Sequence, residues 1–314
     1  MADPQALFAA GNRALAAGRP AEAAAHYRCA LALAPQVPEV HNNLATALLQ
    51  LGQAAAAVET AQQGIALRPG FAALQNTLAN ALQAAGRAVE AAAHYRAALA
   101  AEPGLHSAAV NLAALLAEDG NGEEAERLLQ GVLAVEPETP RALAGLADLH
   151  LRHERTEAAE PLYRRVLAVL PGDEAAANGL AICLLARGRP HEALAIFRDL
   201  TLRHPGRPEL QLNLGQTLQG LGRHDEAVAA FRAVLAADPG NAQVLPFLMQ
   251  SLRYQCDWPA LAPVEARMLA DAEARLAAGA PVAASPFALA GSTASPALRL
   301  AVARAYAERC AARV

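Results

Sequence analysis

Apolar and polar positions along this chain repeat with a period of 34 residues. Self-similarity at a fixed period of roughly 20 to 50 residues indicates an array of stacked structural units. No unit of this length buries its own apolar face, so the pattern predicts a chain that is stable through contacts between neighbours. Leucines, small alanines and large side chains each keep one phase of the period: Leu44, Leu78, Leu112, Leu146, Leu180 and Leu214; Ala23, Ala57, Ala91, Ala125, Ala159, Ala193 and Ala227; Tyr27, Tyr95, Leu129, Tyr163, Phe197 and Phe231.

Glycine and proline divide each 34-residue unit into two predicted helices. Glycine accepts the positive φ of a tight turn, and proline ends a helix because it lacks an N–H donor and clashes with the preceding turn. With the glycine counted as position 15, the helices are predicted over about positions 1–14 and 15–31. Glu154 replaces one expected glycine. The two series are Gly18, Gly52, Gly86, Gly120, Gly188 and Gly222, and Pro35, Pro69, Pro103, Pro137, Pro171, Pro205 and Pro239.

These residues resemble the tetratricopeptide repeat over seven units, from Pro4 to about Asn241. The resemblance implies an all-α fold: a right-handed superhelix of helix pairs (an α-solenoid) with C-terminal capping or linker helices. It also implies a concave surface lined by the first helix of each unit. The expected organisation is seven repeats over 4–241, a partial eighth repeat with one helix over 242–256, and linker or capping helices over 257–314.

The regular array stops at Cys256, where the period predicts a glycine. Asp257 is a good N-cap, so a new helix is predicted over about Trp258–Ala278. The open end of a solenoid needs a cap, and Trp258 and Met268 are expected to cover it. A stretch rich in Gly, Ala, Pro and Ser follows, and a last helix is predicted to run to the end of the chain.

Asparagines are concentrated on one face of the predicted first helices. Eight of the ten asparagines occupy positions 5, 6 or 9 of a unit, where random placement would put about one. These positions are three or four residues apart and therefore share a helix face. Thr77 fills position 6 of the third unit, and Gly145 and Gly179 interrupt the row. We call this set the amide stripe: Asn12, Asn42, Asn43, Asn76, Thr77, Asn80, Asn111, Asn178 and Asn213.

The amide stripe predicts a peptide-binding groove. Asparagine inside a helix costs about 0.5 kcal/mol relative to alanine, so its recurrence suggests a use. An amide offers two donors and an acceptor, and a row of amides can hold the backbone of an extended peptide while ignoring most of its side chains. Position 6 forms the centre of the row, with Asn43, Thr77, Asn111 and Asn213. The competing interpretation is a helix face that is merely solvated.

Composition excludes several other functions. The net charge is −4 and all 26 basic residues are arginine, so the chain lacks the basic surface of a nucleic-acid-binding protein. No apolar run is long enough for a membrane span, and the first residues do not follow the signal-peptide pattern. The four cysteines form no CxxC motif. A cytoplasmic protein with reduced thiols is therefore expected.

Catalytic and metal-binding motifs are not found. His150, His153 and Glu154 lack the spacing of a zinc protease, and no third ligand is evident. No Ser-His-Asp, Cys-His or phosphate-loop signature occurs. Arginines that recur with glutamates on the second helices favour a solvated, charge-balanced outer face over a phosphate site: Arg28, Arg96, Arg164, Arg198 and Arg232.

The array and its tail together resemble bacterial O-GlcNAc transferase-like (SPINDLY-type) protein glycosyltransferases. The resemblance rests on Cys256-Asp257-Trp258, the long helix after it, Ser285-Pro286-Phe287 and the segment SPALRLAVARAYA. It implies that the chain positions protein substrates for sugar transfer from UDP-GlcNAc. The catalytic lobes of that family are not within these residues, so the chain alone is predicted to be non-catalytic and to hold no cofactor. The alternative is a free-standing adaptor. The partner proteins, the sugar donor and any homo-oligomer stay open.

Overall fold

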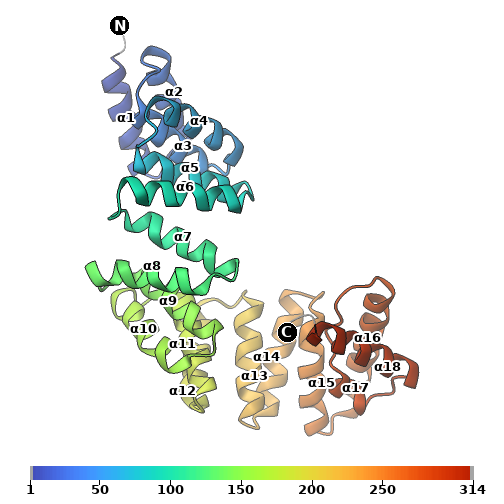
Figure 1. Ribbon diagram of the computed structural model, residues 1–314. Helices are drawn as coiled ribbons and strands as arrows, with labels where there is room; N and C mark the ends of the chain where they lie inside the picture. Colours follow the sequence, from blue (N-terminus) through green and yellow to red (C-terminus); the bar gives the residue numbers. More distant parts are fainter. Residues whose placement is uncertain (1–2, 312–314) are drawn as a thin grey trace. The chain divides into compact units, whose positions relative to one another are not determined.

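The structure is a computed structural model that describes residues 3–311, and no strand occurs among them (Figure 1). The all-α prediction is confirmed. The chain divides into two compact units, residues 1–154 (the N-terminal part) and residues 155–314 (the C-terminal part). Residues 312–314, at the end of the predicted last helix, lie outside the described range.

The N-terminal part is a stack of helices in which each helix packs on the next from α1 to α9. The first helices of successive repeats also pack on one another, α1 on α3, α3 on α5, α5 on α7 and α7 on α9, more closely than the second helices do. A stack of this kind curves toward its first helices, so their free face is the concave one in this part. The helices are α1 (Pro4–Ala16), α2 (Pro20–Leu33), α3 (Pro38–Gln50), α4 (Ala54–Leu67), α5 (Ala72–Ala84), α6 (Ala88–Ala101), α7 (His106–Glu118), α8 (Gly122–Val135) and α9 (Pro140–Arg152).

The C-terminal part continues the alternation of helices and then departs from it. A short 3₁₀ turn, η1, opens the eighth predicted repeat, and a longer helix follows it. The elements are α10 (Thr156–Val169), α11 (Glu174–Ala186), α12 (Pro190–Arg203), α13 (Pro208–Gly220), α14 (His224–Ala237), η1 (Ala242–Val244), α15 (Leu245–Tyr254), α16 (Trp258–Ala277), α17 (Pro286–Ala290) and α18 (Pro296–Ala311).

Turns between the two helices of a repeat share one backbone conformation. The glycines Gly18, Gly52, Gly86, Gly120, Gly188 and Gly222 have φ between 69° and 84°. Glu154 and Cys256 stand where a glycine is expected, and they adopt φ of 58° and 55°. They are the two non-glycine residues with positive φ in the described range. Packing of the repeats therefore imposes the turn even where the side chain disfavours it.

Replacing Glu154 or Cys256 with glycine is expected to raise the free energy of unfolding by about 0.5–1 kcal/mol. The left-handed conformation costs a side-chain-bearing residue about 1 kcal/mol or more, and the greater freedom of glycine in the unfolded chain offsets part of the gain. Thermal unfolding of Glu154→Gly and Cys256→Gly measures the change. Gly52→Ala is the reverse control, since a Cβ there meets nothing within 4 Å and only backbone strain remains. A lower Tm for Glu154→Gly contradicts the argument.

The core is built from the positions that the sequence pattern selects. All seven small alanines of that pattern are 0% exposed, and the large side chains beside them are at most 3% exposed. The small residue lets two helices approach closely, and the large one fills the space between them. The hydrophobic periodicity therefore identifies the core correctly in both parts.

The tail closes the end of the C-terminal part. Asp257 caps α16, because its carboxylate accepts a hydrogen bond from the Ala260 N–H at 3.2 Å. Met268 is 2% exposed and joins a buried cluster with residues of α14, α15 and α18. Trp258 remains 59% exposed. Met268 and its apolar neighbours thus cover the array end, and the expectation that the tryptophan ring does so is wrong.

Candidate functional site

The amide stripe of the N-terminal part lies on the first helices α1, α3, α5 and α7, and most of its side chains hydrogen-bond to one another. Asn43 Nδ2 donates to Asn12 Oδ1 at 2.9 Å, and Asn42 Nδ2 donates to Asn43 Oδ1 at 3.0 Å. The Thr77 hydroxyl donates to Asn42 Oδ1 at 2.8 Å. Hydrogen bonds between side chains about 30 residues apart show that the stripe crosses from one repeat to the next. Its members are exposed or half-buried, apart from the buried Thr77.

Buried tyrosines of the core hydrogen-bond to asparagines of the stripe. The Tyr27 hydroxyl donates to Asn12 Oδ1 at 2.7 Å, so one oxygen accepts from both Tyr27 and Asn43. The arrangement recurs two repeats later, where Asn80 Oδ1 accepts from the Tyr95 hydroxyl at 2.6 Å and from Asn111 Nδ2 at 2.9 Å. A core side chain therefore orients each position-9 amide, which the sequence pattern alone does not reveal.

Burial changes the acidity of these tyrosines. It raises the pKa of the Tyr95 hydroxyl to about 12, against the opposing effects of the Arg141 charge and a hydrogen bond with Asn111. Burial likewise raises the pKa of the Tyr27 hydroxyl. Both hydroxyls thus stay protonated at neutral pH and remain donors to the amide oxygens.

The stripe of the C-terminal part contains one amide pair. Asn213 Nδ2 on α13 donates to Asn178 Oδ1 on α11 at 2.9 Å. The gap at Gly179 has a physical cause, because a Cβ there would lie 2.4 Å from Cζ of the Tyr163 ring. At the other gap, a Cβ on Gly145 would lie 3.4 Å from the Leu129 side chain. The ring of the preceding repeat occupies the space that a side chain at position 179 needs.

Free hydrogen-bonding capacity on the stripe is mostly that of donors. The oxygens of Asn12 and Asn80 each accept two bonds, while their Nδ2 groups donate to no residue in the described range. Those nitrogens are also not among the buried atoms without a partner. Asn178 Nδ2 likewise donates to no residue in the described range and is not among those buried atoms. The face therefore presents N–H groups to solvent, and such groups bind carbonyl oxygens.

Two stripe residues differ from this pattern. Asn76 makes no side-chain hydrogen bond within residues 3–311, and its Oδ1 is buried without a partner. Asn111 Oδ1 accepts from Arg141 Nη2 at 2.9 Å, which places a cation beside the stripe. The structure thus brings together Asn12, Asn42, Asn43 and Thr77 in one network and Asn80 with Asn111 in another, and it pairs Asn178 with Asn213.

The structure contains a buried cluster of charged side chains that the sequence analysis did not predict. Glu160 on α10 is 5% exposed and accepts hydrogen bonds from Arg164 and Arg189 at 2.8 Å each, and also from Arg187. Burial raises the pKa of its carboxyl, but the three guanidinium hydrogen bonds outweigh burial and hold that pKa below its ordinary value. The available signal was a glutamate where most repeats carry an apolar residue: Ala24, Val58, Ala92, Leu194 and Val228. The cluster joins α10 to the next repeat.

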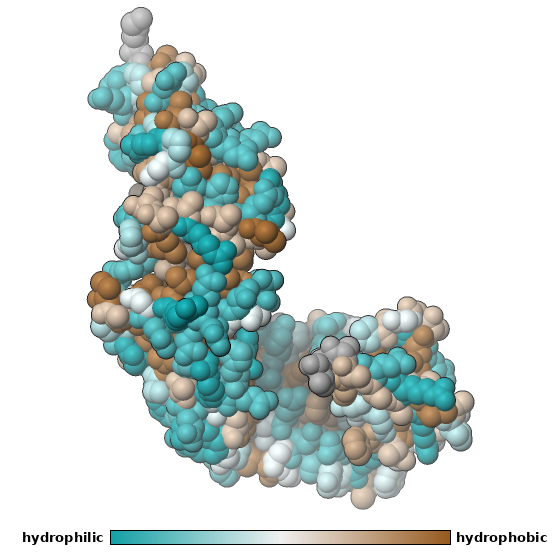
Figure 2. Space-filling model, viewed as in Figure 1, coloured by the Kyte–Doolittle hydropathy of each residue, from teal (hydrophilic) through white to brown (hydrophobic). Residues whose placement is uncertain are grey.

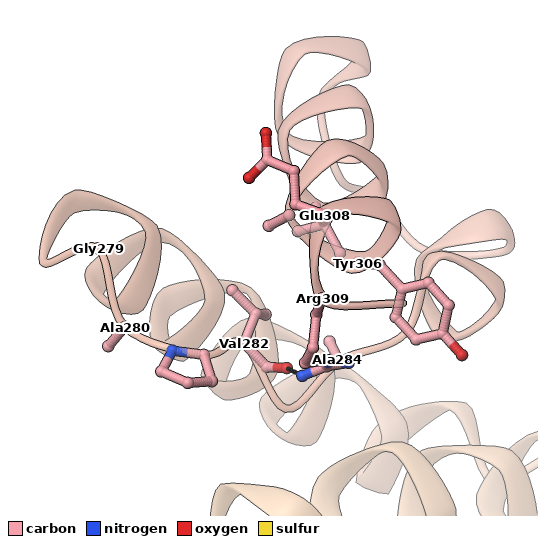
Figure 3. Close-up of a pocket in the computed structure, with 10 residues that line it drawn as sticks. Gly279, Ala280, Val282, Ala284, Tyr306, Glu308 and Arg309 are labelled. Carbon is pink, nitrogen blue, oxygen red and sulfur yellow. Dashed lines mark hydrogen bonds between the residues drawn. The ribbon is translucent and has the colours of Figure 1, made fainter. Parts of the chain in front are cut away.

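The C-terminal part contains cavities near the amide stripe and in the tail. One of about 390 Å³ includes Asn213 and Gln243 in its lining, and one of about 490 Å³ lies between α15 and the segment around α17. A third of about 250 Å³ lies between residues 279–284 and α18. Figure 3 shows Arg309 reaching from α18 to the backbone oxygen of Val282, to which it donates at 3.2 Å. The third cavity is a gap within the tail, remote from the stripe along the chain.

Other kinds of site find no support among residues 3–311. No group of three or more His, Cys, Asp or Glu side chains is placed to hold a metal ion. None of the described helices has the length and apolar character needed to span a bilayer. The surface seen in Figure 2 is largely hydrophilic with scattered apolar patches.

Comparisons with known proteins agree with the repeat architecture. A family model for the tetratricopeptide repeat matches residues 14–81, 82–149, 150–214 and 184–248. No curated protein sequence matches the chain. A tetratricopeptide repeat protein from Parabacteroides merdae aligns with TM-score 0.58 and 16% identity, over 79% of this chain and 98% of that one.

Two further solved structures share the fold. A chain of the APC/C hetero-tetramer Cut9–Hcn1 aligns with TM-score 0.65 and 14% identity over 74% of this chain and 48% of that one. YrrB, described as a tetratricopeptide repeat protein with an unusual peptide-binding site, aligns with TM-score 0.51 and 21% identity over 60% of this chain and 97% of that one. The family model covers well over half of the residues, and this chain therefore belongs to the tetratricopeptide repeat family.

Proposed function

We propose that the amide stripe binds extended peptide segments of other proteins. The observation that carries the proposal is the set of amide N–H groups on Asn12, Asn80 and Asn178 that donate to no described residue. An extended peptide presents a carbonyl oxygen at every residue, and these are the acceptors that such donors bind. YrrB, of the same fold, has a peptide-binding site. The inter-repeat bonds hold the amides in place before a ligand arrives, which reduces the entropy lost on binding.

The double variant Asn111→Ala with Asn213→Ala is expected to weaken peptide binding without unfolding the array. Asn111 and Asn213 donate to the oxygens of Asn80 and Asn178 and so orient the N–H groups of those two amides toward a ligand. Each backbone hydrogen bond lost when an amide is no longer held costs about 1 kcal/mol, so losing both raises Kd roughly 30-fold. Unstructured peptides selected from a displayed random library on the unaltered chain serve as ligands, and calorimetric titration measures Kd. Circular dichroism checks that helix content is unchanged.

A matched control separates the stripe from amides in general. Gln62 and Gln63 lie exposed on α4, a second helix, away from the stripe. The variant Gln62→Ala with Gln63→Ala is expected to leave Kd unchanged. A Kd within twofold of the original in the Asn111 and Asn213 variant would refute peptide binding by the stripe.

A finer proposal is that the chain is the substrate-recognition region of an O-GlcNAc transferase-like enzyme. Its support is the sequence of Cys256-Asp257-Trp258 and Ser285-Pro286-Phe287, where Asp257 and Ser285 cap α16 and α17. Purified 1–314 is expected to transfer no sugar from UDP-GlcNAc to serine-containing peptides. Measurable transfer contradicts that expectation. A coding frame that continues past Val314 into a nucleotide-sugar-binding lobe supports the parentage, while a stop without an adjacent transferase gene favours a free-standing adaptor.

A further inference from the structure

The register of the amide stripe continues into α15, where Phe247 and Gln250 occupy positions 6 and 9 of the unit. Phe247 stands 34 residues after Asn213, and Gln250 stands 34 residues after Gln216. Both line the 490 Å³ cavity between α15 and the segment around α17. The end of the stripe in the C-terminal part is therefore a cavity with an aromatic wall. We call it the aromatic cavity.

One wall of the aromatic cavity is held rigid by contacts from neighbouring helices. The Phe247 ring stacks on Phe231 with centroids 6.0 Å apart, and Gln219 Nε2 donates to the Phe247 carbonyl at 2.9 Å. The Tyr254 ring stacks on His224 with centroids 4.3 Å apart. Aromatic side chains fixed in this way offer apolar contact area without further loss of side-chain freedom.

The opposite wall comes from the tail. Ser285 caps α17 by accepting from the Ala288 N–H at 3.2 Å, and Leu289 anchors the helix at 0% exposure. Arg253 Nη2 donates to the Gly291 carbonyl at 2.8 Å and ties the tail to α15. Phe287 also lines the cavity, and it remains 87% exposed. A phenylalanine held on an anchored helix yet left open to solvent is an exposed apolar surface at the mouth of the cavity.

The residues that line the aromatic cavity favour an uncharged group of a ligand. No carboxylate lines the aromatic cavity, and its one charged side chain is Arg253, whose guanidinium already binds a carbonyl oxygen. The volume falls within the roughly 300–1,000 Å³ of ligand pockets. Gln243 lines both this cavity and the polar one that contains Asn213. The polar and aromatic cavities are therefore neighbours along one face.

We propose that the aromatic cavity receives an uncharged aromatic or long aliphatic side chain of the peptide whose backbone Asn213 holds. This inference rests on the proposed peptide-binding function and adds to it a side-chain preference: the stripe holds the backbone of any sequence, and the cavity selects one large apolar residue. The ligand is thus an extended segment with such a residue just beyond the part that contacts Asn213.

Methionine methyl NMR tests the cavity directly. Met249 lines the aromatic cavity, and Met268 lies in the apolar cluster of α16, where it serves as an internal reference. The probe is N-acetyl-L-phenylalanine amide, added to the full chain labelled with ¹³C-methyl methionine. The Met249 methyl signal is expected to shift and saturate while Met268 stays in place. N-acetyl-L-aspartate amide is expected to shift neither signal.

Two exposed aromatic residues give a matched pair of variants. Phe287→Ala is expected to raise the Kd of the probe at least threefold, whereas Trp258→Ala, which alters an aromatic ring outside the cavity, is expected to leave it unchanged. Because both rings are mostly exposed, neither variant should disturb the fold. A Met249 signal that does not move, or an equal Kd in Phe287→Ala and the unaltered chain, overturns the proposal.

Failure here is distinguishable from failure of the proposed function. The Asn111→Ala with Asn213→Ala variant is expected to keep the Met249 response to the single-residue probe. If that variant loses peptide affinity while the Met249 signal never shifts, the stripe stands and the aromatic cavity is refuted. If the signal shifts but peptide affinity is unaffected by the two asparagines, backbone binding by the stripe is refuted.

Discussion

Replacing Tyr95 with alanine is expected to lower the free energy of unfolding by about 3–5 kcal/mol, the range for deleting a buried aromatic ring. The ring is 0% exposed, and its hydroxyl lies 2.6 Å from Asn80 Oδ1 and 2.9 Å from Gln83 Oε1, the two oxygens that can accept its single proton. Alanine leaves a cavity between the two helices of the third repeat. Urea unfolding followed by circular dichroism measures the loss, and in a repeat array it appears first as early melting of the N-terminal part.

Tyr95→Phe separates the ring from the hydroxyl. It keeps the apolar volume and is expected to lose only about 1 kcal/mol. Tyr254→Ala, at a tyrosine that is 67% exposed, is expected to change stability by about 0.5 kcal/mol or less. A loss in Tyr95→Phe as large as that in Tyr95→Ala would show that the hydroxyl network, and not ring packing, stabilises this repeat.

Tyr95 also makes the stability of the array sensitive to alkaline pH. Burial raises the pKa of the Tyr95 hydroxyl from 10.0 to about 12 in the folded state. A raised folded pKa means that the stabilising effect is complete below pH 10 and is lost as the pH rises toward 12. Tyr95→Phe is expected to reduce this loss, which unfolding curves at pH 9, about 11 and about 12 would reveal.

Replacing Gly179 with alanine is expected to lower the free energy of unfolding by about 1–3 kcal/mol, as overpacking of a filled core does. The new Cβ would lie 2.4 Å from Cζ and 2.6 Å from Cε1 of Tyr163, whose ring is 1% exposed. Gly179→Asn, which would restore the amide stripe in sequence, is expected to lose at least as much. Thermal unfolding of the full chain measures both.

Two variants control this prediction. Gly172→Ala lies in the loop before the same helix, where a Cβ meets nothing within 4 Å, and it is expected to be neutral or slightly stabilising. In a Tyr163→Leu background, Gly179→Ala is expected to be less harmful, since at Gly145, which faces Leu129, an added Cβ would lie 3.4 Å from the leucine side chain and not 2.4 Å. Equal Tm values for Gly179→Ala and Gly172→Ala would show that the Tyr163 ring moves aside freely.

Much of the fold could be predicted because the same residue types recur at the same positions of each repeat. The turn glycines, the small alanines and the large core residues occur where their shape is needed, and the structure buries the last two sets almost completely. The amide stripe was found for the same reason, since a helix face is readable from spacing alone. That the stripe holds a peptide is a prediction that binding measurements must test.

Other features depend on what lies opposite a residue, which spacing does not report. Glu154 and Cys256 adopt the left-handed turn because the repeat packs around them, although neither side chain favours it. Glu160 is tolerated in a core position only because its carboxylate binds Arg164 on the same helix and Arg187 and Arg189 from the turn between α11 and α12. Trp258, expected to cover the open end of the array, is left exposed because Met268 and its neighbours fill that end.

The sequence by itself determined the repeat, its helices, its core and the face on which the asparagines lie, because these follow from residue type and a local period of 34. Only the tertiary structure decided which hydrogen-bonding groups on that face remain available and where a cavity forms. The oxygens of Asn12 and Asn80 are used by Tyr27 and Tyr95, which leaves the N–H groups free. The aromatic cavity exists because α17 is held against α15. Both depend on contacts between residues distant in sequence, whose partners are set by packing and not by period.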